Sequence, residues 1–108
     1  MQKESKDPRW PGYVVLPSYM SFPMLGQWEK GMADAKMAGE GDVTSEFFHK
    51  LLKPVLFIVK EWHIEGLPDK VDEDTFPASH KFIGWLIDEV SDLYTRTNEP
   101  DPLEQERP

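Results

Sequence analysis

Apolar side chains recur at helical spacing in three segments of this chain. In the first segment, one helical face is formed by Leu25, Trp28, Met32 and Ala35, which follow one another at intervals of three or four residues. Ser21 is a suitable N-cap, and Pro23 stands in the first turn, where proline is tolerated. The pattern predicts a helix over residues 22–37, which Gly31 weakens by roughly 1 kcal/mol relative to alanine. Residues 38–42 are expected to form a flexible link.

The second segment is the most apolar part of the chain. Its large apolar residues cover more than half of a helical circumference: Phe47, Phe48, Leu51, Leu52, Val55, Leu56, Ile58, Val59 and Trp62. Such a helix packs against at least two neighbours and is therefore central. We expect it to start at Thr44 or Ser45 and to end before Gly66. Pro54 either kinks this helix or opens a separate one that runs to Trp62.

The third segment has the most regular stripe of apolar residues, formed by Phe82, Ile83, Leu86, Ile87, Val90, Leu93 and Tyr94. Ser79 is its expected N-cap. Glu89 and Asp92 lie off the stripe and are interpreted as a solvated face. The acidic residues at 69–76 are expected to form a solvated loop before this helix.

The two ends of the chain carry little apolar material. Residues 1–12 are expected to form a flexible N-terminal arm, and residues 96–108, which are acidic and rich in proline, a disordered tail. Residues 13–16 are strand-like, but Pro17 stops them. This segment either lies extended across the helices, which we prefer, or pairs with a partner chain. The predicted fold class is all-α, with a three-helix domain over residues 13–95 and an extended N-terminal arm.

Composition narrows the range of partners. A chain of 108 residues has room for one domain. A net charge of -8 disfavours nucleic acid and anionic membranes. The chain has no cysteine and no apolar leader, and its longest apolar run, residues 55–59, cannot span a bilayer. We therefore expect a cytoplasmic protein.

The candidates for catalysis are weak. His63-Ile64-Glu65 has the His-x-Glu form of zinc deaminases, but the cysteine ligands of those enzymes are missing. His49 and His80 stand on other segments, so no pair of histidines is preorganised for a metal. Glu89-x-x-Asp92 is too small a set for a magnesium-dependent nucleotide hydrolase. The sequence predicts no enzyme, no metal site and no cofactor.

Aromatic residues point instead to protein binding. Large aromatic side chains supply contact area with few rotamers to restrict. The predicted contact residues are Trp10, Tyr13, Phe22, Met24 and Trp85. Core positions are preferred for Trp28 and Trp62, and for Trp85 a core position is an equal alternative. Residues 19–25 form either core or an adaptable methionine-rich groove, and core is preferred.

Three blocks of the sequence carry a family resemblance. Residues 59–68 (VKEWHIEGLP), 76–79 (FPAS) and 83–90 (IGWLIDEV) resemble small tail proteins of siphophages, in particular their tail assembly chaperones. Residues 11–17 (PGYVVLP), followed by Trp28-Glu29, are also similar to that group. The resemblance spans residues 11–94. It implies a mostly helical protein that coats the long tape measure protein until the tail tube polymerises around it.

The resemblance supplies no catalytic or contact residues. Its expected partner is the tail tape measure protein or the tail tube protein, and homo-oligomerisation stays open. The alternative is a small structural component that remains in the phage tail or another particle. In that role, residues 13–16 would add a strand to a neighbouring protein.

Overall fold

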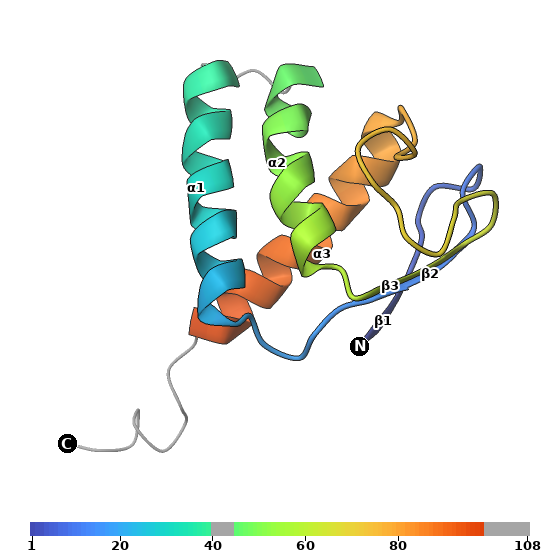
Figure 1. The fold of residues 1–108 in the computed structure, drawn as a ribbon, viewed down its shortest axis with the longest axis horizontal. Helices are drawn as coiled ribbons and strands as arrows, with labels where there is room; N and C mark the ends of the chain where they lie inside the picture. Colours follow the sequence, from blue (N-terminus) through green and yellow to red (C-terminus); the bar gives the residue numbers. More distant parts are fainter. Residues whose placement is uncertain (40–44, 99–108) are drawn as a thin grey trace.

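The computed structural model describes residues 1–39 and 45–98. Three helices and a three-stranded antiparallel sheet make up the fold. Their bounds are β1 Gln2–Glu4, β2 Gly12–Val15, α1 Phe22–Gly39, α2 Ser45–Ile58, β3 Glu61–Ile64 and α3 His80–Asn98. Helices α1 and α2 lie side by side and antiparallel, α3 crosses behind them, and the sheet lies beside the lower part of α2 (Figure 1).

The predicted all-α class is wrong, because the chain contains a sheet in the order β1-β2-β3. β1 pairs with β2 through Lys3 and Val14, and β3 pairs with β2 through Trp62 and Val14. The strand-like segment at residues 13–16 therefore has partners within its own chain. One comes from the charged N-terminal segment, and the other from residues that were assigned to the end of the second helix.

The extended, flexible N-terminal arm also needs correction. Residues 2–4 form the edge strand β1, and Asp7 is buried. Lys3 lies 3.4 Å from the Glu89 carboxylate of α3, so Glu89 is not part of a freely solvated face. Polar contacts fix the arm, and a pattern of apolar residues cannot predict such contacts.

The predicted helices agree with the structure at their starts, but the second helix ends at Ile58 and not just before Gly66. The Ser21 hydroxyl accepts a hydrogen bond from the Met24 N–H at 3.4 Å, and α1 begins at Phe22. α2 begins at Ser45 and contains Pro54 within one continuous helix, which rules out a separate helix opened by this proline. The expected link at 38–42 overlaps α1 at its first two residues, and 40–42 lie outside the described residues. α3 extends to Asn98, and residues 99–108 of the expected tail are likewise not described.

The core lies between the helices and the inner face of the sheet. Val14, Trp62 and Ile64 point inward from the sheet and are buried. They meet a row of aromatic rings, in which Phe82 contacts Phe76 at 5.3 Å and Trp85 at 5.5 Å between ring centroids. Trp28 and Trp62 are buried, which confirms the core positions preferred for them.

Candidate functional site

The charged and polar side chains are the first candidates for a functional site. Within residues 1–39 and 45–98, no three His, Asp or Glu side chains gather closely enough to hold a metal ion. His49 and His80 lie on different helices and His63 lies on β3, and all three are exposed. His63 stacks on Tyr13 with ring centroids 4.6 Å apart. His63 thus lies apart on the sheet, whereas His49 and His80 line one groove from two different helices.

The buried polar pair Asp7 and Ser79 joins the N-terminal segment to α3. The Ser79 hydroxyl donates to the Asp7 carboxylate at 2.6 Å and accepts from the Phe82 N–H at 3.2 Å. Asp7 also accepts from the Arg9 N–H at 3.0 Å. The hydrogen bond from Ser79, then those from Arg9 and its charge, hold the pKa of Asp7 below its usual value although burial opposes this. Both partners are engaged in fastening β1 and capping α3, which is a structural task.

The most unusual surface of the molecule is an exposed apolar one, which we call the apolar end. It consists of Tyr19, Phe22 and Phe57, which are 64%, 89% and 50% exposed. Phe22 begins α1 and Phe57 lies in the last turn of α2, so the antiparallel arrangement brings them to the same end of the helix pair (Figure 1). Large aromatic side chains exposed at one end of a helix pair are candidates for a protein-binding surface.

The loop that carries Tyr19 is anchored by residues on both sides of this ring. Leu16 is fully buried and Met20 is nearly so. The Met20 N–H donates to the Thr97 hydroxyl at 3.0 Å, which ties the loop to the end of α3. The Leu16 N–H donates to the Met1 carbonyl at 2.8 Å. Because the loop is anchored on both sides of Tyr19, this ring is presented to a partner with little further ordering.

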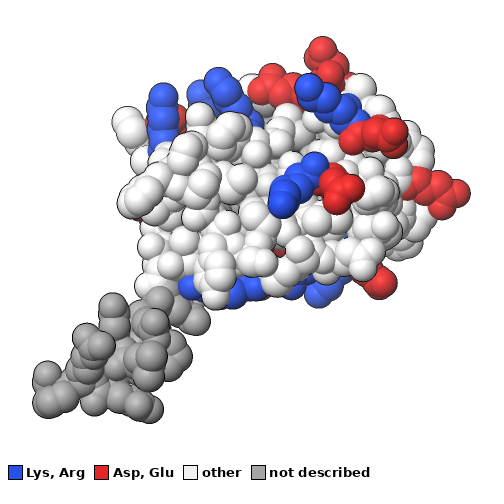
Figure 2. All heavy atoms as spheres, turned by 60° about the horizontal axis from the view of Figure 1, so that its bottom comes forward, with Lys and Arg blue, Asp and Glu red and all other residues white. Residues whose placement is uncertain are grey.

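The segment of the apolar end that carries Tyr19 and Phe22 is also poor in charge. Residues 12–28 contain no charged side chain, although charged residues make up 30% of the chain. Figure 2, in which the bottom of Figure 1 comes forward, shows a face that is largely white, with one basic and acidic pair near its middle and the other charged groups toward its margins. A surface without charge can be covered by a partner without the cost of desolvating ions.

The five predicted contact residues do not form one site. Phe22 is fully presented to solvent at the apolar end, and Met24, two residues later, is partly buried against the core. Tyr13 lies on the outer face of the sheet against His63. Trp10 packs over Phe82, with its ring close to Gly66, which adopts a left-handed φ of 90°. Trp85 is only 5% exposed, so a partner cannot reach it.

Two residues of the apolar end were missed by sequence reasoning. Tyr19 was assigned with its neighbours to the core, and Phe57 was left out of every predicted surface. A signal for Phe57 exists: it follows Lys53 by four residues and Lys50 by seven, which places it on the polar face of α2. An aromatic residue among lysines on a polar face is a candidate for contact.

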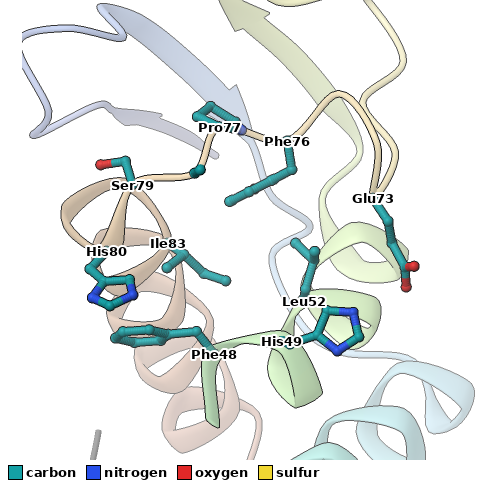
Figure 3. A pocket seen from close by; sticks show the side chains of 10 residues that line it. Phe48, His49, Leu52, Glu73, Phe76, Pro77, Ser79, His80 and Ile83 are labelled. Atoms are coloured by element: carbon teal, nitrogen blue, oxygen red, sulfur yellow. The ribbon is translucent and has the colours of Figure 1, made fainter. Parts of the chain in front are cut away.

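A second feature is a groove of about 330 Å³ between the first turns of α2 and α3. Leu52, Phe76 and Ile83 point into it, with Phe48 beside His80 at one side and Glu73 and His49 at the other (Figure 3). The Phe48 and His80 rings are 4.7 Å apart. The groove is apolar at its centre and polar at its rim, which is a usual composition for a ligand or peptide site.

Comparisons with protein-family models, with curated proteins and with solved structures each find no match for this chain. The described residues include no helix long and apolar enough to cross a membrane.

Proposed function

We propose that this chain is a non-catalytic protein-binding protein whose apolar end docks on an apolar surface of another protein. The observation that carries this proposal is that Tyr19, Phe22 and Phe57 are all at least half exposed at one end of the helix pair, where residues 12–28 contain no charged side chain. Large rings of this kind, when covered by a partner, dominate the binding energy of many interfaces.

The net charge of -8 suits the same role. A protein that exposes aromatic groups in its unbound state needs another property that opposes self-association. Like charge on the rest of the surface supplies mutual repulsion between copies. An apolar docking surface on a strongly acidic body is the combination expected of an assembly chaperone.

The family resemblance supplies the identity of the partner. We propose that the chain acts in the cytoplasm of the producing cell as a tail assembly chaperone, and that its partner is the tape measure protein. A tape measure protein is long and helical with apolar faces, so it needs cover before the tail tube forms. The apolar end provides a complementary surface.

The test is co-expression with the large helical tail protein of the same genome, followed by affinity purification. The wild-type chain is expected to co-purify with that protein, and the double variant Tyr19→Ser/Phe22→Ser to lose it. Met37→Ser is the matched control, because Met37 is 81% exposed but lies near the opposite end of α1. Equal recovery of all three forms would reject the apolar end as the docking surface.

A structural component of the particle is the alternative. Its proposed route, strand addition to residues 13–16, is closed because β2 already has β1 on one side and β3 on the other. A structural component would therefore need another contact. Mass spectrometry of purified particles separates the two roles, since a chaperone is absent from finished particles and a structural component is retained.

A further inference from the structure

Three lysines border a hollow between α1 and α2. Lys30 comes from α1, and Lys50 and Lys53 come from α2; the hollow that they line has a volume of about 310 Å³. Gly31 and Pro54 also line the hollow and lie close together. A Cβ atom at position 31 would be 2.7 Å from the proline ring. Within the described parts of the chain, none of the three lysines forms an ion pair.

This gathering of unpaired positive charge stands out in a chain with a net charge of -8. Asp34 and Glu73 also line the hollow, but neither lies within ion-pair distance of a lysine there. Three lysines against two carboxylates leave the lining of the hollow with a net positive charge, and this charge attracts a carboxylate from outside. The charge of the hollow therefore favours an acidic occupant.

The lysine-bordered hollow continues into the apolar groove of Figure 3. Both are lined by His49 and Glu73, so they adjoin at the start of α2. One end of the combined surface offers ammonium groups, and the other offers Leu52, Phe76 and Ile83. A ligand that uses both ends must carry negative charge next to a large apolar group.

We propose that this combined surface binds an acidic segment of a partner protein, with one large apolar side chain in the groove and neighbouring carboxylates against Lys30, Lys50 and Lys53. The buried anchor supplies most of the affinity, and the carboxylates fix its direction and speed its approach. A nucleic acid is a poor occupant, because a long polyanion would meet the acidic remainder of the surface. A short peptide segment is confined to the hollow and the groove, where it meets three lysines and the two carboxylates of Asp34 and Glu73.

The proposal goes beyond the docking role of the apolar end and does not depend on it, because the two surfaces share no residue. They do share one face of α2, where Lys50, Lys53 and Phe57 are all exposed. A single partner can therefore run from the apolar end along this face to the groove.

The test uses the full chain and a fluorescein-labelled synthetic peptide with four glutamates followed by tryptophan and leucine. A second peptide has glutamine in place of each glutamate. Fluorescence anisotropy at low salt is expected to show binding of the acidic peptide at least about tenfold tighter than the glutamine peptide, with a loss of affinity as salt rises. Equal affinity for the two peptides would overturn the proposal.

Charge-reversal variants locate the site. Lys50→Glu/Lys53→Glu is expected to weaken binding of the acidic peptide about tenfold, because two attractive pairs become repulsive. Lys6→Glu/Lys70→Glu changes the net charge equally at exposed positions outside the surface and is expected to change affinity less than twofold. If both variants weaken binding alike, only the overall charge matters and the proposal fails. Circular dichroism shows that each variant is folded.

Two other occupants are outcomes of the same experiments. Residues 99–108 of this chain are acidic and contain one leucine, Leu103. If a peptide of residues 96–108 binds the groove more tightly than the probe does, the occupant is the chain's own end. If the wild-type chain dimerises in sedimentation velocity and Lys50→Glu/Lys53→Glu does not, the occupant is a second copy. Either result would overturn the partner proposal.

Discussion

Asp7 and Ser79 lie 72 residues apart in the sequence and are joined by the 2.6 Å hydrogen bond from the serine hydroxyl to the carboxylate. The same hydroxyl caps α3. The Ser79 side chain thus caps α3 and also fixes the N-terminal segment through its hydrogen bond to Asp7. Sequence reasoning identified the cap, because Ser79 precedes the apolar stripe, but nothing near Asp7 distinguishes it from a solvated acid. Only the fold reveals that it is buried.

Removal of the Ser79 hydroxyl is expected to destabilise the protein. Ser79→Ala loses the helix cap and leaves Asp7 short of a donor, so the free energy of unfolding should fall by about 1–2 kcal/mol. Urea denaturation followed by tryptophan fluorescence measures the difference. Ser18→Ala, at an exposed loop position, is the control and should be within about 0.5 kcal/mol of wild type. A Ser79→Ala protein as stable as the control would contradict this assignment.

Asp7 should also make stability depend on pH at the acid end. Its hydrogen bonds lower its pKa in the folded state, so the unfolded chain takes up the proton more readily. This contribution is complete above the pKa of the unfolded chain, near 4, and is lost as the pH falls through the lower pKa of the folded protein. The free energy of unfolding, measured by denaturation at a series of pH values from 6 to 2, should fall less steeply with decreasing pH for Asp7→Asn than for wild type. Parallel pH profiles would exclude Asp7 as a contributor.

At the scale of elements, the close approach of α1 and α2 depends on Gly31 and Pro54. Pro54 has no N–H, so the Lys50 carbonyl one turn earlier loses its usual helical donor. Gly31 faces both this carbonyl and the proline ring, where a Cβ atom would be 2.7 Å from the ring. The sequence indicated Gly31 only as a weak point of a helix. Its role in packing depends on a neighbour that lies more than twenty residues away.

Two glycines of α1 should respond oppositely to the same substitution. Gly26 has nothing within 4 Å of its Cβ position, so Gly26→Ala should stabilise the protein by about 0.5–1 kcal/mol through helix propensity. Gly31→Ala gains the same helix propensity, but its Cβ atom would push α1 away from the rigid ring of Pro54. A net decrease of about 1–2 kcal/mol in the free energy of unfolding is therefore expected. Thermal unfolding of both variants measures this contrast. A stabilised Gly31→Ala protein would disprove the close packing.

Sequence reasoning found the helices but missed the sheet, for a physical reason. The three helices bury long stripes of apolar residues, and such stripes are visible as a period of three or four. β1 consists of Gln2, Lys3 and Glu4 and has no apolar residue to show a period. β3 contains Trp62 and Ile64, and Trp62 also continues the helical stripe of α2, so the pattern alone favoured one longer helix. Pairing with β2 overrides that local preference.

At the scale of the whole molecule, surface composition is divided between two regions. The apolar end is aromatic, and its segment within residues 12–28 has no charged side chain, whereas Lys30, Lys50 and Lys53 border the hollow between α1 and α2. Of the predicted contact residues, Phe22 lies at the apolar end and Trp85 lies in the core. Helical periodicity predicts which residues are buried. It does not predict which end of a helix stays exposed to solvent, because that depends on the lengths of the elements packed beside it.

Hydrogen–deuterium exchange of the chain, alone and bound to the co-expressed helical tail protein, tests the docking surface most directly. Residues 17–22 and 56–58 are expected to become protected from exchange in the complex, while the outer face of the sheet around Tyr13 and His63 keeps its rate. Protection of the sheet with an unchanged apolar end would contradict the account.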